Sequence, residues 1–140
     1  ERREWLLGQL PAVDALGDGP LVIDRVGRDA SGAVWVQLYN RGGAPVSLGG
    51  LYLSGFTRWP TQWRLPALTL PPGEFLTFRE GAAGTQRLGA TIRPERPELS
   101  LFASNGESAV DLLWLAPLRP GEAYGRQPRG AEAFAPQPGP

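Results

Sequence analysis

Residues 33–43 read AVWVQLYNRGG, and this stretch indicates the fold. Val34, Val36 and Leu38 occupy every second position, so a β-strand places them on one face and the side chains between them on the other. The sequence Asn-Arg-Gly-Gly at residues 40–43 then ends the strand with residues that favour turns. We therefore predict a β-strand that buries one of its two faces.

Short apolar runs separated by turn signals continue on both sides of this strand. About eight such runs lie between Leu21 and Tyr124. The clearest hairpin covers residues 99–115, where Asn105 and Gly106 join two apolar runs and both tolerate a positive φ. Many short strands joined by short turns predict an all-β fold, an antiparallel β-sandwich.

The composition is that of a single β-rich domain. The chain has 140 residues, of which 41% are hydrophobic, so there is enough apolar material for one core. Its 19 glycines and 15 prolines are too many for a helical bundle but suit strands joined by tight turns. Fourteen acidic residues balance fourteen basic residues, and every basic residue is an arginine. The resulting net charge of zero does not favour a nucleic-acid-binding protein.

The chain has no cysteine, histidine or methionine, which excludes disulfides, thiol nucleophiles, haem and the usual zinc and copper ligands. Asp14, Asp18 and Asp29 could offer oxygen ligands to calcium, but their spacing lacks the D-x-D-x-D-G pattern, so a linker turn is expected instead. We predict no metal site and no cofactor. No run approaches the ~20 apolar residues that cross a bilayer, and any targeting signal is expected upstream of Glu1.

The two ends of the chain differ from its middle. Residues 1–10 (ERREWLLGQL) have a helix-forming composition, and Pro11 discourages its continuation. The predicted organisation is a helix or linker over residues 1–20, a β-sandwich over 21–127 and a Pro/Gly-rich tail over 128–140.

Carboxylates are the remaining candidates for acid–base catalysis. Five of them lie in or near the expected strands, and no two have a spacing that suggests a shared site. These are Asp24, Asp29, Glu74, Glu80 and Asp111. A serine nucleophile lacks an activating base, because neither histidine nor lysine is present. We expect these carboxylates to be solvated at strand edges and turns, and we expect no enzymatic activity.

A cluster of tryptophan and arginine is the best candidate for a binding surface. Exposed tryptophan beside arginine suits contact with a protein, peptide or sugar. Trp59, which precedes Pro60 in an expected loop, is the surface candidate, with Arg58 and Arg64 as neighbouring contacts. Two other tryptophans, Trp35 and Trp63, are expected to fill the core.

Five stretches carry a further pattern in a fixed order. They are residues 35–40 (WVQLYN), 46–54 (VSLGGLYLS), 63–78 (WRLPALTLPPGEFLTF), the hairpin at 99–113, and 124–128 (YGRQP). Together they resemble the motifs of the lamin-tail domain family across residues 21–135. Two positions depart from the family: Gln37 stands where an acidic residue is usual, and Leu51 stands where Trp or Tyr is common.

The resemblance implies an immunoglobulin-like antiparallel β-sandwich without catalytic activity. It further implies an accessory module of a larger secreted or surface bacterial protein, which binds a protein or cell-surface partner, or spaces domains, outside the cytoplasm. Residues 1–10 resemble the last helix of spore-coat-protein-H-like (CotH) kinase domains, which often precede lamin-tail domains. The alternative function is nucleic-acid binding through an arginine patch, since related domains occur in nuclear lamins and beside secreted nucleases.

Overall fold

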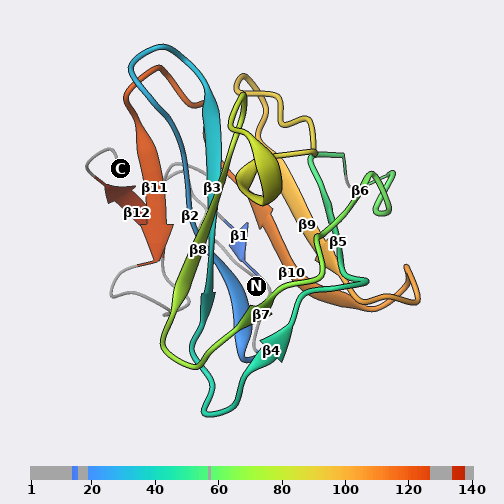
Figure 1. Cartoon of the computed structure of the whole chain (residues 1–140). Coiled ribbons are helices and arrows are strands. Elements are labelled where there is room, and N and C mark those ends of the chain that lie inside the picture. The colour runs from blue at the N-terminus through green and yellow to red at the C-terminus, as the bar shows by residue number, and fades with distance from the viewer. Residues whose placement is uncertain (1–13, 16–18, 57, 127–133, 138–140) are drawn as a thin grey trace, which may run out of the picture.

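The computed structural model describes residues 14–15, 19–56, 58–126 and 134–137. Two five-stranded sheets form two layers with a core between them, as Figure 1 shows. Every pair of neighbouring strands is antiparallel. The predicted antiparallel β-sandwich is confirmed. In this part of the chain, no helix has the length and apolar character needed to span a membrane.

The strands of each layer follow one another in space in an order that differs from their order in the chain. Sheet A consists of β1 (Asp14–Ala15), β10 (Ala109–Trp114), β9 (Glu98–Phe102), β5 (Tyr52–Ser54) and β6 (Trp63–Arg64). Sheet B consists of β12 (Phe134–Gln137), β11 (Ala123–Arg126), β2 (Leu21–Arg28), β3 (Val34–Asn40) and β8 (Phe75–Arg79). A separate pair joins β4 (Val46–Ser47) to β7 (Thr69–Leu70), and a 3-10 turn, η2, covers Gly84–Gln86.

Strand β3 has the alternation that its sequence predicts. Val34, Val36 and Leu38 are all buried in the core between the sheets. Trp35 points to the other face of sheet B and is nevertheless buried, because its ring packs against Gly27 of β2: a Cβ atom built on Gly27 would lie 2.7 Å from Trp35 Cζ2. Trp35 is therefore buried as expected, on the outer face of sheet B rather than in the cluster between the two sheets.

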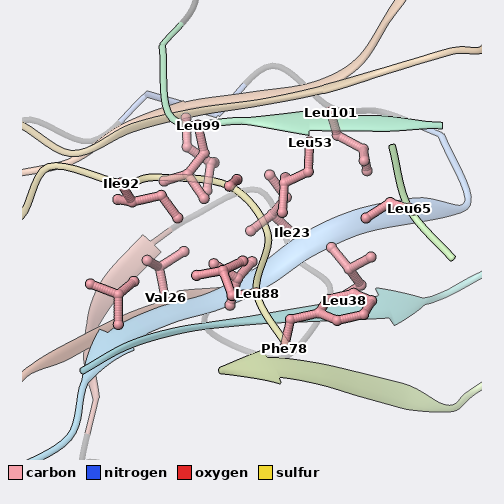
Figure 2. Close-up of a cluster of buried hydrophobic side chains, with 14 of the residues drawn as sticks. Ile23, Val26, Leu38, Leu53, Leu65, Phe78, Leu88, Ile92, Leu99 and Leu101 are labelled. Atoms are coloured by element: carbon pink, nitrogen blue, oxygen red, sulfur yellow. The ribbon is translucent and has the colours of Figure 1, made fainter. Parts of the chain in front are cut away.

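The core draws side chains from both sheets. Figure 2 shows them converging from β2, β3 and β8 on one side and from β5 and β9 on the other. Its largest fully buried aliphatic and phenylalanine members are Phe78, Ile23, Leu38, Leu48, Leu53, Leu99, Leu101 and Leu113. Burying each such side chain contributes about 1.5–3 kcal/mol, so this core is the main source of stability.

The connection from β8 to β9 closes one open side of the sandwich. Leu88, Ala90 and Ile92 in this connection are buried in the core, after the turn η2. Nearby, the ring of Trp63 from β6 meets the ring of Phe78 edge-on, with centroids 5.1 Å apart. Trp63 thus packs on the core from the edge of sheet A, as its sequence context predicts.

The predicted hairpin is present as β9 and β10, joined by a turn around residues 104–107 as the sequence predicts. The amide of Ala103 donates to the carbonyl of Ser108 at 2.8 Å, and Gly106 has a φ of 72°. Asn105 does not have a positive φ; its side-chain oxygen accepts hydrogen bonds from the amides of Glu107 and Ser108. The asparagine therefore stabilises the turn through its side chain, as an Asx turn does.

Both predicted end segments contribute edge strands. Within the expected linker, Asp14–Ala15 forms β1 and pairs with β10, and within the expected tail, Phe134–Gln137 forms β12 and pairs with β11. An edge strand needs only backbone groups for pairing, and it tolerates proline, so a tail sequence with Pro136 can extend a sheet. The helix predicted over residues 1–10 lies outside the described residues.

Candidate binding surface

The loop that joins β5 to β6, residues 55–62, carries the tryptophan predicted to be exposed. We call it the Trp59 loop; Thr57 within it lies outside the described residues. The side-chain oxygen of Gln62 accepts hydrogen bonds from the amides of Gly55 at 3.0 Å and Thr91 at 3.3 Å. The amide of Trp59 donates to the carbonyl of Phe56 at 2.8 Å. These bonds hold the loop in a tight turn at the edge of sheet A (Figure 1).

Trp59 is 55% exposed, more than any other large hydrophobic side chain in the described part of the chain. Arg58 beside it is also exposed. Trp35, in contrast, is 1% exposed, and Trp63 is partly buried on the core. The structure therefore places Trp59 and Arg58 together on the surface, where the sequence predicts them.

Arg64, the third predicted contact, lies on β6 rather than in the loop. Its neighbour Trp63 faces the core, so Arg64 faces the outer side of sheet A, where it is exposed. Its guanidinium Nη2 lies 3.8 Å from the position of a Cβ built on Gly50, at the end of β5 away from the Trp59 loop. The Arg64 side chain therefore points away from Trp59.

A contact that the sequence did not predict links the Trp59 loop to a groove. The Arg93 guanidinium carbon lies 4.8 Å from the centroid of the Phe56 ring, a cation–π geometry. Arg93 Nη2 also lies 3.3 Å from Glu98 Oε2 in an ion pair. Phe56 and Arg93 come from segments far apart in sequence, so no local pattern reveals their contact.

The groove beyond Arg93, which we call the 93–117 groove, has a volume of about 430 Å³. Its lining consists of Arg93, Glu95, Arg96, Pro97, Glu98, Trp114, Leu115, Ala116 and Pro117. None of these residues was predicted from the sequence to belong to a site. Their two segments are not marked by any motif, and only the pairing of β9 with β10 brings them together.

A second groove, the Arg64–Arg87 groove, has a volume of about 220 Å³. Its lining consists of Trp63, Arg64, Pro66, Gly84, Thr85, Arg87 and Gly89. It contains two arginines and no carboxylate, so its lining carries a positive charge.

Two carboxylates expected to be solvated are buried. Asp111 is 1% exposed, and its two oxygens accept hydrogen bonds from the amides of Ile23 at 2.8 Å and Leu112 at 2.9 Å. Asp24 is fully buried, and it is the extra residue of a bulge in β2. The expectation of solvation is wrong for two different reasons: Asp24 is displaced by the bulge, whereas Asp111 lies two residues before the core residue Leu113 and shares its face. Neither carboxylate lines either groove.

The three other candidate carboxylates lie at strand ends and turns, as predicted. Asp29 accepts hydrogen bonds from the Ser31 hydroxyl and from the amides of Ser31 and Ala33. The hydroxyl bond, followed by the amides and the nearby Arg79 guanidinium, outweighs desolvation and holds the pKa of Asp29 below its usual value of 3.8. Glu80 accepts from the Val34 amide at 2.8 Å, and Glu74 is exposed. Asp29 thus acts as the cap of the β2–β3 turn.

The described residues contain no group of three acidic side chains that could hold a metal ion. Of the three aspartates weighed for calcium, Asp18 lies outside the described residues, as do the side-chain contacts of Asp14. Asp29 is engaged in its own turn.

Comparisons of the chain with protein-family models and with curated proteins found no match.

Proposed function

We propose that this chain is a non-catalytic binding module, whose contact with a protein partner is centred on Trp59 and Arg58. The observation that carries the proposal is the exposure of Trp59, at 55%, on a loop fixed by internal hydrogen bonds. An exposed tryptophan ring contributes little to the stability of the domain itself, because it buries little apolar surface. Its burial by a partner would contribute favourably to the free energy of binding.

The physical basis of the contact is the burial of a large aromatic ring without much loss of entropy. Tryptophan and arginine are enriched among interface residues that contribute 2 kcal/mol or more. Gln62 fixes both ends of the Trp59 loop through the amides of Gly55 and Thr91, so binding does not need to order those ends. Arg58 adds a planar cation next to the ring, which suits a carboxylate on the partner.

The resemblance to lamin-tail domains supports the same class of function. We propose on that resemblance alone that the module belongs to a larger secreted or surface bacterial protein and acts outside the cytoplasm. A module that only spaces domains would bind no partner, and this alternative does not account for the exposure of Trp59.

The experiment is a selection of partners from a displayed library of random peptides, with the folded domain as the target. Trp59→Ala is the test variant. Phe75→Ala is the matched control, because Phe75 is the other large exposed hydrophobic residue, at 37%, and lies on sheet B. We expect enriched peptides that bind the parent chain and Phe75→Ala equally. Their affinity for Trp59→Ala should be weaker by roughly 30-fold, about 2 kcal/mol.

Two outcomes would overturn the proposal. The first is a selection that enriches no peptide against the parent chain. The second is a set of peptides that bind Trp59→Ala as tightly as the parent chain.

Nucleic-acid binding is a second candidate, and the Arg64–Arg87 groove is the observation that favours it. Its two arginines, without a carboxylate in the lining, suit a phosphate. Anisotropy of a labelled DNA duplex at rising salt tests it. Binding that weakens steeply with salt and is lost in Arg87→Ala would support this function, and no binding at low salt would remove it.

A further inference from the structure

The walls of the 93–117 groove are two proline-containing segments joined by backbone hydrogen bonds. The amide of Leu115 donates to the carbonyl of Pro97 at 3.0 Å, and the amide of Leu118 donates to that of Pro94 at 2.8 Å. Proline fixes the backbone φ angle, so these walls have little freedom to lose. The groove is therefore formed before any ligand arrives, which lowers the cost of binding.

An aromatic ring and an ion pair lie side by side in this groove. Leu99 and Leu113, which are partners across β9 and β10, face the core. The next pair, Glu98 and Trp114, therefore faces the outer side of sheet A. Glu98 Oε2 lies 3.3 Å from Arg93 Nη2, so a donor and an acceptor group stand next to the partly exposed indole of Trp114.

The charge of the lining selects among ligands. Arg93 and Arg96 are balanced by Glu95 and Glu98, so the groove has no net formal charge. A phosphate or carboxylate polymer would meet two carboxylates there, and a cationic one would meet two guanidinium groups. A neutral ligand avoids both kinds of like-charge repulsion. Hydroxyl groups suit this lining, because a hydroxyl can both donate and accept a hydrogen bond.

We propose that the 93–117 groove binds a neutral polysaccharide. Trp114 stacks on the apolar face of one sugar ring, and the Arg93–Glu98 pair exchanges hydrogen bonds with its hydroxyl groups. The groove is partly open to solvent, so a ligand that fills it can continue beyond the site. Trp59 does not line this groove, although Arg93 contacts Phe56 of the Trp59 loop, and the proposal does not depend on the function proposed for that loop.

The first test is electrophoresis of the native chain through gels that contain one polysaccharide each. The probes are the neutral polymers β-glucan, xylan, galactomannan and dextran, with heparin as the anionic comparison. We expect at least one neutral polymer to retard the chain, with an effect that is insensitive to salt. In Trp114→Ala the dissociation constant should rise about tenfold or more, and in Trp59→Ala it should not change.

The second test uses the parent chain, so it does not depend on the folding of a variant. Oligosaccharide fragments of the retarding polymer are added while the indole N–H and arginine Nε–H signals are followed by NMR. We expect the signals of Trp114 and Arg93 to shift and that of Trp59 to stay unchanged.

Three results would overturn the proposal. They are no retardation by any neutral polymer, retardation by heparin alone, and shifts at Trp59 without shifts at Trp114. Because the Trp59 loop is tested with peptides and Phe75→Ala as a control, either proposal can fail without the other.

Discussion

Replacing Gly55 by alanine tests how the Trp59 loop is attached to the sandwich. A Cβ on Gly55 would overlap the carbonyl oxygen of Thr91 and would lie 2.8 Å from the Thr91 carbonyl carbon and 2.9 Å from Ile92 Cα. All three atoms belong to the backbone, so no side-chain rotation relieves the overlap. The substitution must separate β5 from the segment that carries Ile92 into the core.

The cost follows from what this separation breaks. Overpacking a tight site costs about 1–3 kcal/mol even when side chains can move aside. Here the separation also disturbs the bonds by which Gln62 holds the amides of Gly55 and Thr91, at about 1 kcal/mol each. We expect Gly55→Ala to lose about 3 kcal/mol or more of unfolding free energy, which lowers Tm by roughly 10 °C.

The assay is urea unfolding followed by tryptophan fluorescence, with thermal unfolding by circular dichroism beside it. Gly43→Ala is the matched control, because nothing lies within 4 Å of a Cβ built on Gly43. That control should be neutral or slightly stabilising, by up to about 1 kcal/mol. If Gly55→Ala is as stable as Gly43→Ala, the close packing of the loop against the 88–92 segment is wrong.

Three further predictions concern stability, and urea unfolding measures each of them. Asp111→Ala removes the buried acceptor of the Ile23 and Leu112 amides and should cost about 2–5 kcal/mol. A loss under 1 kcal/mol would show that these two hydrogen bonds contribute little. Because folding lowers the pKa of Asp29 from 3.8, its ionised form stabilises the fold above about pH 4, and this contribution disappears as the pH falls through the lowered pKa. Asp29→Asn should therefore be less stable than the parent chain at pH 7, with a difference that closes in acid; a difference that is constant down to pH 2 would contradict the assignment. Trp59→Ala should leave the unfolding free energy within about 0.5 kcal/mol of the parent chain, and a loss above 2 kcal/mol would mean that the ring belongs to the fold rather than to a contact surface.

The fold was predictable because its strands alternate. The period of two in β3 assigned Val34, Val36 and Leu38 to the core correctly, and the Asn105–Gly106 sequence marked the hairpin of β9 and β10. These signals are local in the chain. When the face of a sheet that lies toward the core is buried, apolar residues recur at every second position along its strands.

The buried carboxylate on β10 does not depend on the bulge in that strand. Asp111 and the core residue Leu113 pair with Leu101 and Leu99 without a shift between them, so alternation places Asp111 on the core face. The bulge at Val110 lies before this stretch. A carboxylate is usually exposed, and the buried place of Asp111 is satisfied by its bond with the Ile23 amide of the opposite sheet, which no local pattern in the sequence reveals.

The candidate site was predictable only in part. Trp59 was identified because it precedes Pro60 in an expected loop, and in the structure it is 55% exposed. The contact of Arg93 with Phe56 and the groove beside Trp114 arise from strand pairing between distant segments. Such juxtapositions depend on tertiary structure, and a single sequence does not encode them in any local pattern.

The most direct test of the proposed contact surface is hydroxyl-radical footprinting of the domain with and without a saturating amount of a selected peptide. Trp59 and Phe75 should both be oxidised in the free chain, since they are 55% and 37% exposed. We expect the peptide to protect Trp59 several-fold and to leave Phe75 unchanged. Equal oxidation of Trp59 in the free and the bound chain would contradict a contact centred on this ring.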